Sequence, residues 1–114
     1  MNAIIKSDDI EQAIHNTEEL FVRAGRAKVA AEAADLRRKR VRATLFVKYK
    51  GAGKGAGESE QFAEADPVYE AACTDWELAA YDSETLKAQS EAKRMRFEAW
   101  RTANATERAR MNLR

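Results

Sequence analysis

Four of the five glycines in this 114-residue chain lie at alternate positions in one short stretch, from Gly51 to Gly57. Glycine leaves the backbone freer than any other residue, and the only proline, Pro67, follows soon after this stretch. Together these residues divide the chain into two arms. We therefore predict a single all-α domain, a long antiparallel helical hairpin. Its first arm covers residues 8–50, its flexible glycine-rich tip residues 51–66, and its second arm residues 67–110.

The composition is typical of long charged helices. Charged residues make up 34% of the chain, and alanine, the best helix former, supplies much of the apolar share. A net charge of +1 creates no overall field toward nucleic acid or an anionic membrane. No apolar run is long enough to span a membrane, and no secretory signal is evident. The single cysteine, Cys73, cannot form an internal disulfide. We expect a cytoplasmic protein that does not bind a membrane.

Acidic residues mark the start of the first arm. Asp8 is followed three residues later by Glu11, which is a variant of the capping box that begins a helix. Apolar and small residues then recur at helical spacing: Ile10, Ala13, Ile14, Thr17, Phe21 and Ala24. Gly25 interrupts them, and either the helix continues at a cost of about 1 kcal/mol or it bends there. Residues 44–49 are rich in β-branched and aromatic side chains, but no second strand candidate lies nearby, so we predict helix.

The second arm has a well-marked start, with Asp66 as the N-cap and Pro67 at the first helical position. Every seventh residue then forms a heptad pattern with large residues toward its ends: Tyr69, Trp76, Ser83, Ser90, Phe97, Asn104 and Met111. An antiparallel pairing of residue i with a residue near 117 minus i places Phe21 beside Phe97.

The charge pattern supports the same pairing. Residues 1–22 have a net charge of −4 and would lie beside residues 92–114, whose net charge is +5. Residues 23–50 carry +8 and would lie beside residues 58–91, which carry −9. Blocks of this kind disfavour parallel and slipped pairings. A domain-swapped dimer would satisfy the same pattern between two chains, so the sequence leaves both arrangements open.

A second apolar stripe on the first arm indicates self-association. Its residues recur every seven positions and are distinct from the apolar face that begins at Ile10. A helix with two apolar stripes can contact one partner inside the hairpin and a second partner outside it. Tryptophan is the residue most able to anchor an interface by itself, and this slender fold carries several large aromatic residues. The predicted partner or oligomer interface comprises Val22, Val29, Leu36, Trp76, Phe97 and Trp100. We expect a homo-oligomer, as a helical bundle or coiled coil.

The sequence gives little support for catalysis, a cofactor or a metal site. His15 is the only histidine, Cys73 has none near it in the second arm, and the carboxylates of residues 58–84 lack a Glu-x-x-His repeat. Lys54 lies among glycines, but Gly55 stands where a phosphate-binding loop requires Ser or Thr. We expect neither an enzyme nor a nucleotide site.

A basic block in the middle of the chain has two interpretations. Its predicted nucleic-acid contacts are Arg37, Arg38, Lys39, Arg40, Arg42, Lys48, Lys50 and Lys54. Such a block can lie along phosphates, or the acids of the second arm can neutralise it, which we favour. We therefore predict a non-catalytic helical interaction protein that associates with itself and docks on a macromolecular partner. The alternative is a nucleic-acid-binding accessory protein that uses residues 37–54.

Two stretches also resemble small helical proteins encoded by phages and prophages. They are the run Ala33-Ala34-Asp35-Leu36-Arg37-Arg38-Lys39-Arg40 and the run Lys93-Arg94-Met95-Arg96-Phe97-Glu98-Ala99-Trp100-Arg101. The similarity is one of composition along most of the chain, and it carries no functional residue over to this sequence. It implies a helical, coiled-coil-like protein of phage origin.

Overall fold

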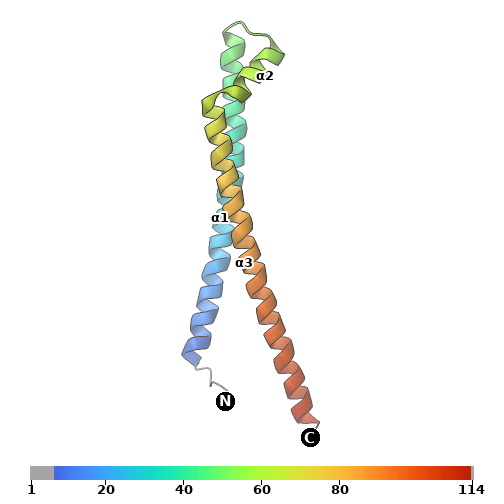
Figure 1. Ribbon diagram of the computed structural model, residues 1–114. Helices are drawn as coiled ribbons and strands as arrows, with labels where there is room; N and C mark the ends of the chain where they lie inside the picture. The colour runs from blue at the N-terminus through green and yellow to red at the C-terminus, as the bar shows by residue number, and fades with distance from the viewer. Residues whose placement is uncertain (1–6, 114) are drawn as a thin grey trace. The chain divides into compact units, whose positions relative to one another are not determined.

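The computed structural model describes residues 7–113 and contains three helices and no strand in that range (Figure 1). Helix α1 spans Ser7–Gly51, α2 spans Ala56–Ala65 and α3 spans Pro67–Asn112. Two long helices joined by a short one confirm the predicted all-α hairpin. Helix α1 includes residues 44–49 as predicted, and it passes through Gly25 without a break.

The tip differs from the flexible loop predicted over residues 51–66, because most of it forms α2. The helix begins after Gly55, whose carbonyl accepts a hydrogen bond from the backbone N–H of Ser59 at 2.8 Å. It buries Ser59 and Ala63. The glycines only reach residue 57, and the next eight residues are good or neutral helix formers with no breaker among them. The prediction extended the influence of the glycines too far along the chain.

Helix α1 ends in a Schellman motif that requires glycine. The backbone N–H of Lys54 bonds to the carbonyl of Tyr49 at 3.3 Å, and that of Gly53 bonds to the carbonyl of Lys50 at 3.1 Å. Gly53 has a φ of 93°, the only positive φ among the described residues. A side chain is disfavoured in that conformation, so Gly53 fixes where the first arm ends.

Asp66 links all three helices at the other end of α2. Its carboxylate accepts a hydrogen bond from the backbone N–H of Val68 at 2.8 Å, which confirms it as the N-cap of α3. The same carboxylate accepts a hydrogen bond of 2.7 Å from the hydroxyl of Tyr49 on α1. The Tyr49 hydrogen bond, followed by that from Val68, lowers the pKa of Asp66, and the bond to Asp66 raises the pKa of Tyr49.

The chain forms two compact units, each containing a segment of α1 and a segment of α3. Unit 1 consists of Met1–Ala24 and Thr85–Arg114, and unit 2 consists of Gly25–Glu84, which includes α2. In unit 2 the buried apolar residues are Ala27, Ala34, Leu45, Ala63 and Ala72. In the described part of unit 1 only Leu86 and Ser90 are buried. Between residues 7 and 113, none of the helices combines the length and apolar character of a membrane span.

Candidate functional site

An open groove in unit 1 gathers five of that unit's large apolar side chains, Ile10, Ile14, Phe21, Phe97 and Trp100. It has a cavity volume of about 440 Å³ and lies between α1 and α3. The α1 wall consists of Asp9, Ile10, Ala13, Ile14, Thr17, Glu18 and Phe21, and the α3 wall of Arg94, Phe97 and Trp100. We call this surface the apolar groove. Phe21 and Phe97 both line it, as the antiparallel register predicts for this part of the chain.

The large side chains of the apolar groove are only half buried. Ile10, Ile14, Phe21, Phe97 and Trp100 retain between 43% and 52% of their accessible surface. The rings of Phe97 and Trp100 lie one turn apart on α3 and stack with their centroids 5.9 Å apart. These contacts order the aromatic side chains without removing them from water. The groove is therefore a cluster of half-exposed apolar side chains, the kind of surface that can anchor an interface.

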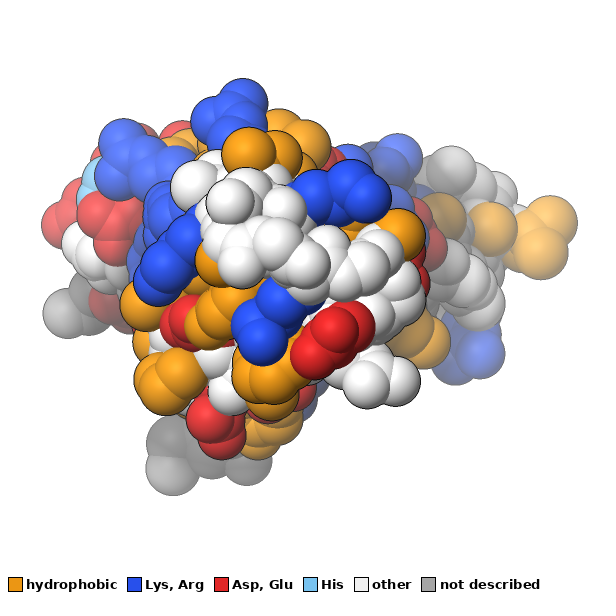
Figure 2. Space-filling view, turned by 90° about the horizontal axis from the view of Figure 1, so that it is seen from above, with side chains coloured by type: hydrophobic (Ala, Val, Ile, Leu, Met, Phe, Trp, Pro, Cys, Tyr) orange, Lys and Arg blue, Asp and Glu red, His pale blue; other side chains and the backbone are white. Residues whose placement is uncertain are grey.

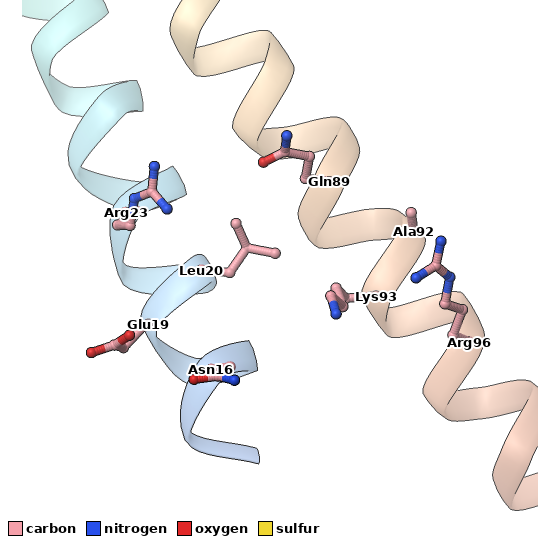
Figure 3. Close-up of a pocket in the computed structure, with 8 residues that line it drawn as sticks. All are labelled: Asn16, Glu19, Leu20, Arg23, Gln89, Ala92, Lys93 and Arg96. Atoms are coloured by element: carbon pink, nitrogen blue, oxygen red, sulfur yellow. The ribbon is translucent and has the colours of Figure 1, made fainter. Parts of the chain in front are cut away.

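A second cavity in unit 1, of about 430 Å³, opens on a different face of the same two helix segments (Figure 3). Its lining residues are Asn16, Glu19, Leu20, Arg23, Gln89, Ala92, Lys93 and Arg96. In Figure 3, Leu20 points from α1 toward α3 and Gln89 points back toward α1. Leu20 is the only large apolar side chain there. This cavity lacks the aromatic anchors that make the apolar groove a good docking surface.

The other predicted interface residues occupy two kinds of position. Val22, Val29 and Leu36 on α1 are each more than half exposed. Trp76 in unit 2 is half buried, and the guanidinium carbon of Arg38 lies 4.4 Å from the centroid of its ring. One face of Trp76 is thus covered within the chain by a cation–π contact. From the sequence we identified an apolar helix face that includes Ile10, Ile14 and Phe21, but we did not assign these residues to an interface. The structure places them in the apolar groove with Phe97 and Trp100.

Half of the predicted basic contacts are paired with acids of unit 2. Asp35 binds Arg38 at 2.5 Å and Lys39 at 3.1 Å. The hydrogen bonds from Arg38 and then Lys39 lower the pKa of Asp35. From the sequence we expected the acids of the second arm to neutralise the basic block, and we did not include Asp35. Asp35 lies three residues before Arg38 and four before Lys39, which is the usual spacing of an ion pair on a helix.

Residues beyond α1 neutralise two further cations. Arg42 binds Glu64 of α2 at 2.8 Å, and this hydrogen bond raises the pKa of Arg42. Lys54 lies 3.7 Å from Glu58 and its ammonium lies 4.0 Å from the centroid of the Phe62 ring. The remaining predicted cations, Arg37, Arg40, Lys48 and Lys50, form no ion pair with other residues in the range 7–113. Figure 2 shows the molecule from above, and on this face Lys and Arg side chains lie next to hydrophobic side chains.

Residues associated with catalysis or metal binding remain dispersed. His15 contacts Glu19 at 3.2 Å one turn away on the exposed surface of α1, and Cys73 is half buried with a free thiol. Among residues 7–113, no group of three His, Cys, Asp or Glu side chains is arranged to hold a metal ion. The absence of enzymatic activity and of a cofactor stays a prediction.

The apolar groove and the four unpaired cations are therefore the surfaces from which a function can be inferred. Comparison of the chain with protein-family models, with curated proteins and with solved structures found no match. The chemistry of these two surfaces is therefore what indicates a function.

Proposed function

We propose that this protein is a non-catalytic helical interaction protein that associates with a second copy of itself through the apolar groove. The observation that carries this proposal is the concentration of five half-exposed large apolar side chains in one groove of unit 1. Full burial of such a side chain stabilises by about 1.5–3 kcal/mol, so half burial leaves roughly 1 kcal/mol per side chain for an interface. Aromatic residues in a preformed groove are efficient anchors.

The physics of helix pairs supports the same conclusion. Two helices that pack only on each other bury one stripe each, and a wider apolar face requires further helices to cover it. In unit 1 both helix segments contribute to such a face, with Ile14 and Phe21 from α1 and Phe97 and Trp100 from α3. A second hairpin supplies two more helices and completes a four-helix bundle.

Sedimentation equilibrium on the full chain tests the proposal. At tens of micromolar we expect a mass twice the monomer value of 12.8 kDa. Trp100→Ala should shift the equilibrium toward monomer because it removes a central anchor. Met95→Ala is the matched control, since Met95 lies on the same helix, is 67% exposed and does not line the groove. A monomeric wild-type protein, or equal effects of the two substitutions, would contradict the proposal.

A second candidate function, nucleic-acid binding, is favoured by the cations that have no acidic partner in the described chain. Arg37, Arg40, Lys48 and Lys50 are all exposed on α1, and a group of basic side chains can contact phosphates. Because only four cations are available, we expect weak, sequence-independent binding that is lost near physiological salt.

The resemblance to phage-encoded helical proteins also stays a prediction.

Titration of labelled single- and double-stranded oligonucleotides at two salt concentrations tests this candidate. The double substitution Arg37→Gln and Arg40→Gln should abolish the low-salt binding without unfolding the protein. Submicromolar affinity at about 0.15 M salt would make nucleic acid the principal partner. No binding at low salt would remove this candidate and leave the self-associating protein.

A further inference from the structure

The two walls of the apolar groove carry opposite charges. On the α1 side of unit 1, residues 8–24 include five acids and one Arg, for a net charge of −4. On the α3 side, residues 85–113 include seven bases and three acids, for a net charge of +4. The groove itself has Asp9 and Glu18 at one wall and Arg94 at the other. Charge therefore distinguishes the two helices that a partner would meet.

These charges are not paired across the groove within one chain. The ion pairs found among the described residues of unit 1 are His15–Glu19 and Glu107–Arg110, and each lies within a single helix. No ion pair joins the described α1 and α3 segments of this unit. The acidic and basic walls thus remain available to complementary charges on a partner, and a second copy of this chain carries both.

Two copies can bring their grooves face to face in two symmetric ways. With the two-fold axis along the helices, the chains are parallel and α1 of each copy lies on α3 of the other. With the axis across the helices, α1 lies on α1 and α3 lies on α3. The first arrangement places the −4 wall on the +4 wall twice, whereas the second places like charges together, which is unfavourable.

We propose that unit 1 pairs with unit 1 of a second copy with the two chains parallel, so that α1 of each copy packs on α3 of the other. This arrangement rests on the proposed self-association and specifies its geometry. In both arrangements each helix has two antiparallel neighbours, as in an up-down four-helix bundle, so the charges of the two walls decide between them. A two-fold axis along the helices preserves level, so Phe21 of one copy lies near Phe97 of the other.

A distance between spin labels distinguishes the parallel dimer from the second arrangement, in which the two-fold axis runs across the helices. We call that second arrangement the crossed dimer. The label is attached to Asn112→Cys in a Cys73→Ser background, because Cys73 is the only native cysteine. Helices 8–10 Å apart in a four-helix bundle place the two α3 helices about 11–14 Å apart across the diagonal. Asn112 lies 15 residues beyond Phe97, near the groove centre, so a crossed dimer separates the labels by about 45 Å at 1.5 Å per residue.

We expect the short distance, somewhat lengthened by the label linkers, in a protein whose mass is that of a dimer. A dimer with a distance near 45 Å would overturn the parallel geometry and leave the proposed function standing. A protein that remains at 12.8 kDa would remove both.

Charge reversal provides an independent test of which walls meet. In the parallel dimer, Glu18→Lys and Arg94→Glu should each raise the Kd about tenfold, because each places like charges together at two symmetric positions. An equimolar mixture of the two variants should recover wild-type affinity as a heterodimer, since lysine on one copy then faces glutamate on the other. Such recovery cannot arise from contacts within one chain. Unchanged affinity of both single variants, or no recovery in the mixture, would contradict the proposed pairing.

Discussion

Units 1 and 2 are built from the same two long helices, but they differ in the size of the side chains between them. In unit 2 four of the five buried apolar residues are alanines, and Leu45 is the one large member. In unit 1 the large side chains of the apolar groove remain half exposed. Small residues allow helices to approach closely and bury their shared face, whereas an aromatic groove needs further surface to cover it.

The polar contacts show the same difference. Unit 2 joins its helices through Arg42–Glu64 and Tyr49–Asp66, while the ion pairs found in the described part of unit 1 stay within one helix. Unit 2 is thus stabilised by contacts within the chain. In unit 1 the large apolar side chains of the groove stay half exposed, and no ion pair joins its described α1 and α3 segments; this contrast is the basis of the proposed association.

The strongest test of this contrast is Leu45→Ala. Leu45 is only 7% exposed, so its truncation should lower the free energy of unfolding by about 2–5 kcal/mol. Because Leu45 lies in unit 2, the dimer Kd measured under native conditions should change little. Urea denaturation combined with sedimentation checks both quantities. A loss of association without a loss of stability would reverse the roles that we assign to the two units.

A smaller, pH-dependent effect is expected for Tyr49→Phe, which removes the hydroxyl that binds Asp66 in unit 2. The hydrogen bond lowers the folded-state pKa of Asp66 below its usual value of 3.8. Its stabilisation is therefore present above the unfolded-state pKa and is lost as pH falls through the folded-state pKa. The variant should melt a few degrees below wild type at pH 7 and converge with it in acid. A melting difference that is independent of pH would argue against the role of Asp66.

Gly53→Ala should have the smallest effect, about 1 kcal/mol of destabilisation, because alanine is strained at a φ of 93°. Gly51→Ala is the matched control, since Gly51 is the last residue of α1, has no positive φ and also has open space where a Cβ would stand. Chemical denaturation of the two variants gives the comparison. Equal stabilities would show that the Schellman motif does not fix the end of α1.

The sequence predicted the features that depend on local chemistry. The Asp66 cap, Pro67 at the first helical position and the helix over residues 44–49 follow from propensity and capping, and the structure confirms them. The outcome at Gly25 could not be derived, because a cost near 1 kcal/mol is decided by the packing of the whole helix. Helix α2 was missed because the glycine-rich stretch dominated the interpretation of helix-forming residues after it.

The candidate site was predicted only in part. Phe97 stood out through its size and heptad position and Trp100 through its size, and the structure places both in the groove. Ile10 and Ile14 carried the same helical periodicity as ordinary core residues, and periodicity does not tell a buried stripe from one left open. That distinction depends on how closely α1 and α3 approach, which is a tertiary property. Asp35, in contrast, could have been found from its spacing to Arg38 and Lys39.

Hydrogen exchange resolved by residue, at protein concentrations below and above the one at which the mass doubles, tests the central claim most directly. Backbone amides of α1 and α3 that flank the apolar groove, in residues 10–21 and 94–100, should gain protection as the dimer forms. Amides of unit 2 near Ala34 and Ala72 should be protected at both concentrations and change little. Protection of the groove segments that is independent of concentration, or a gain confined to unit 2, would contradict the claim that unit 1 is the interface.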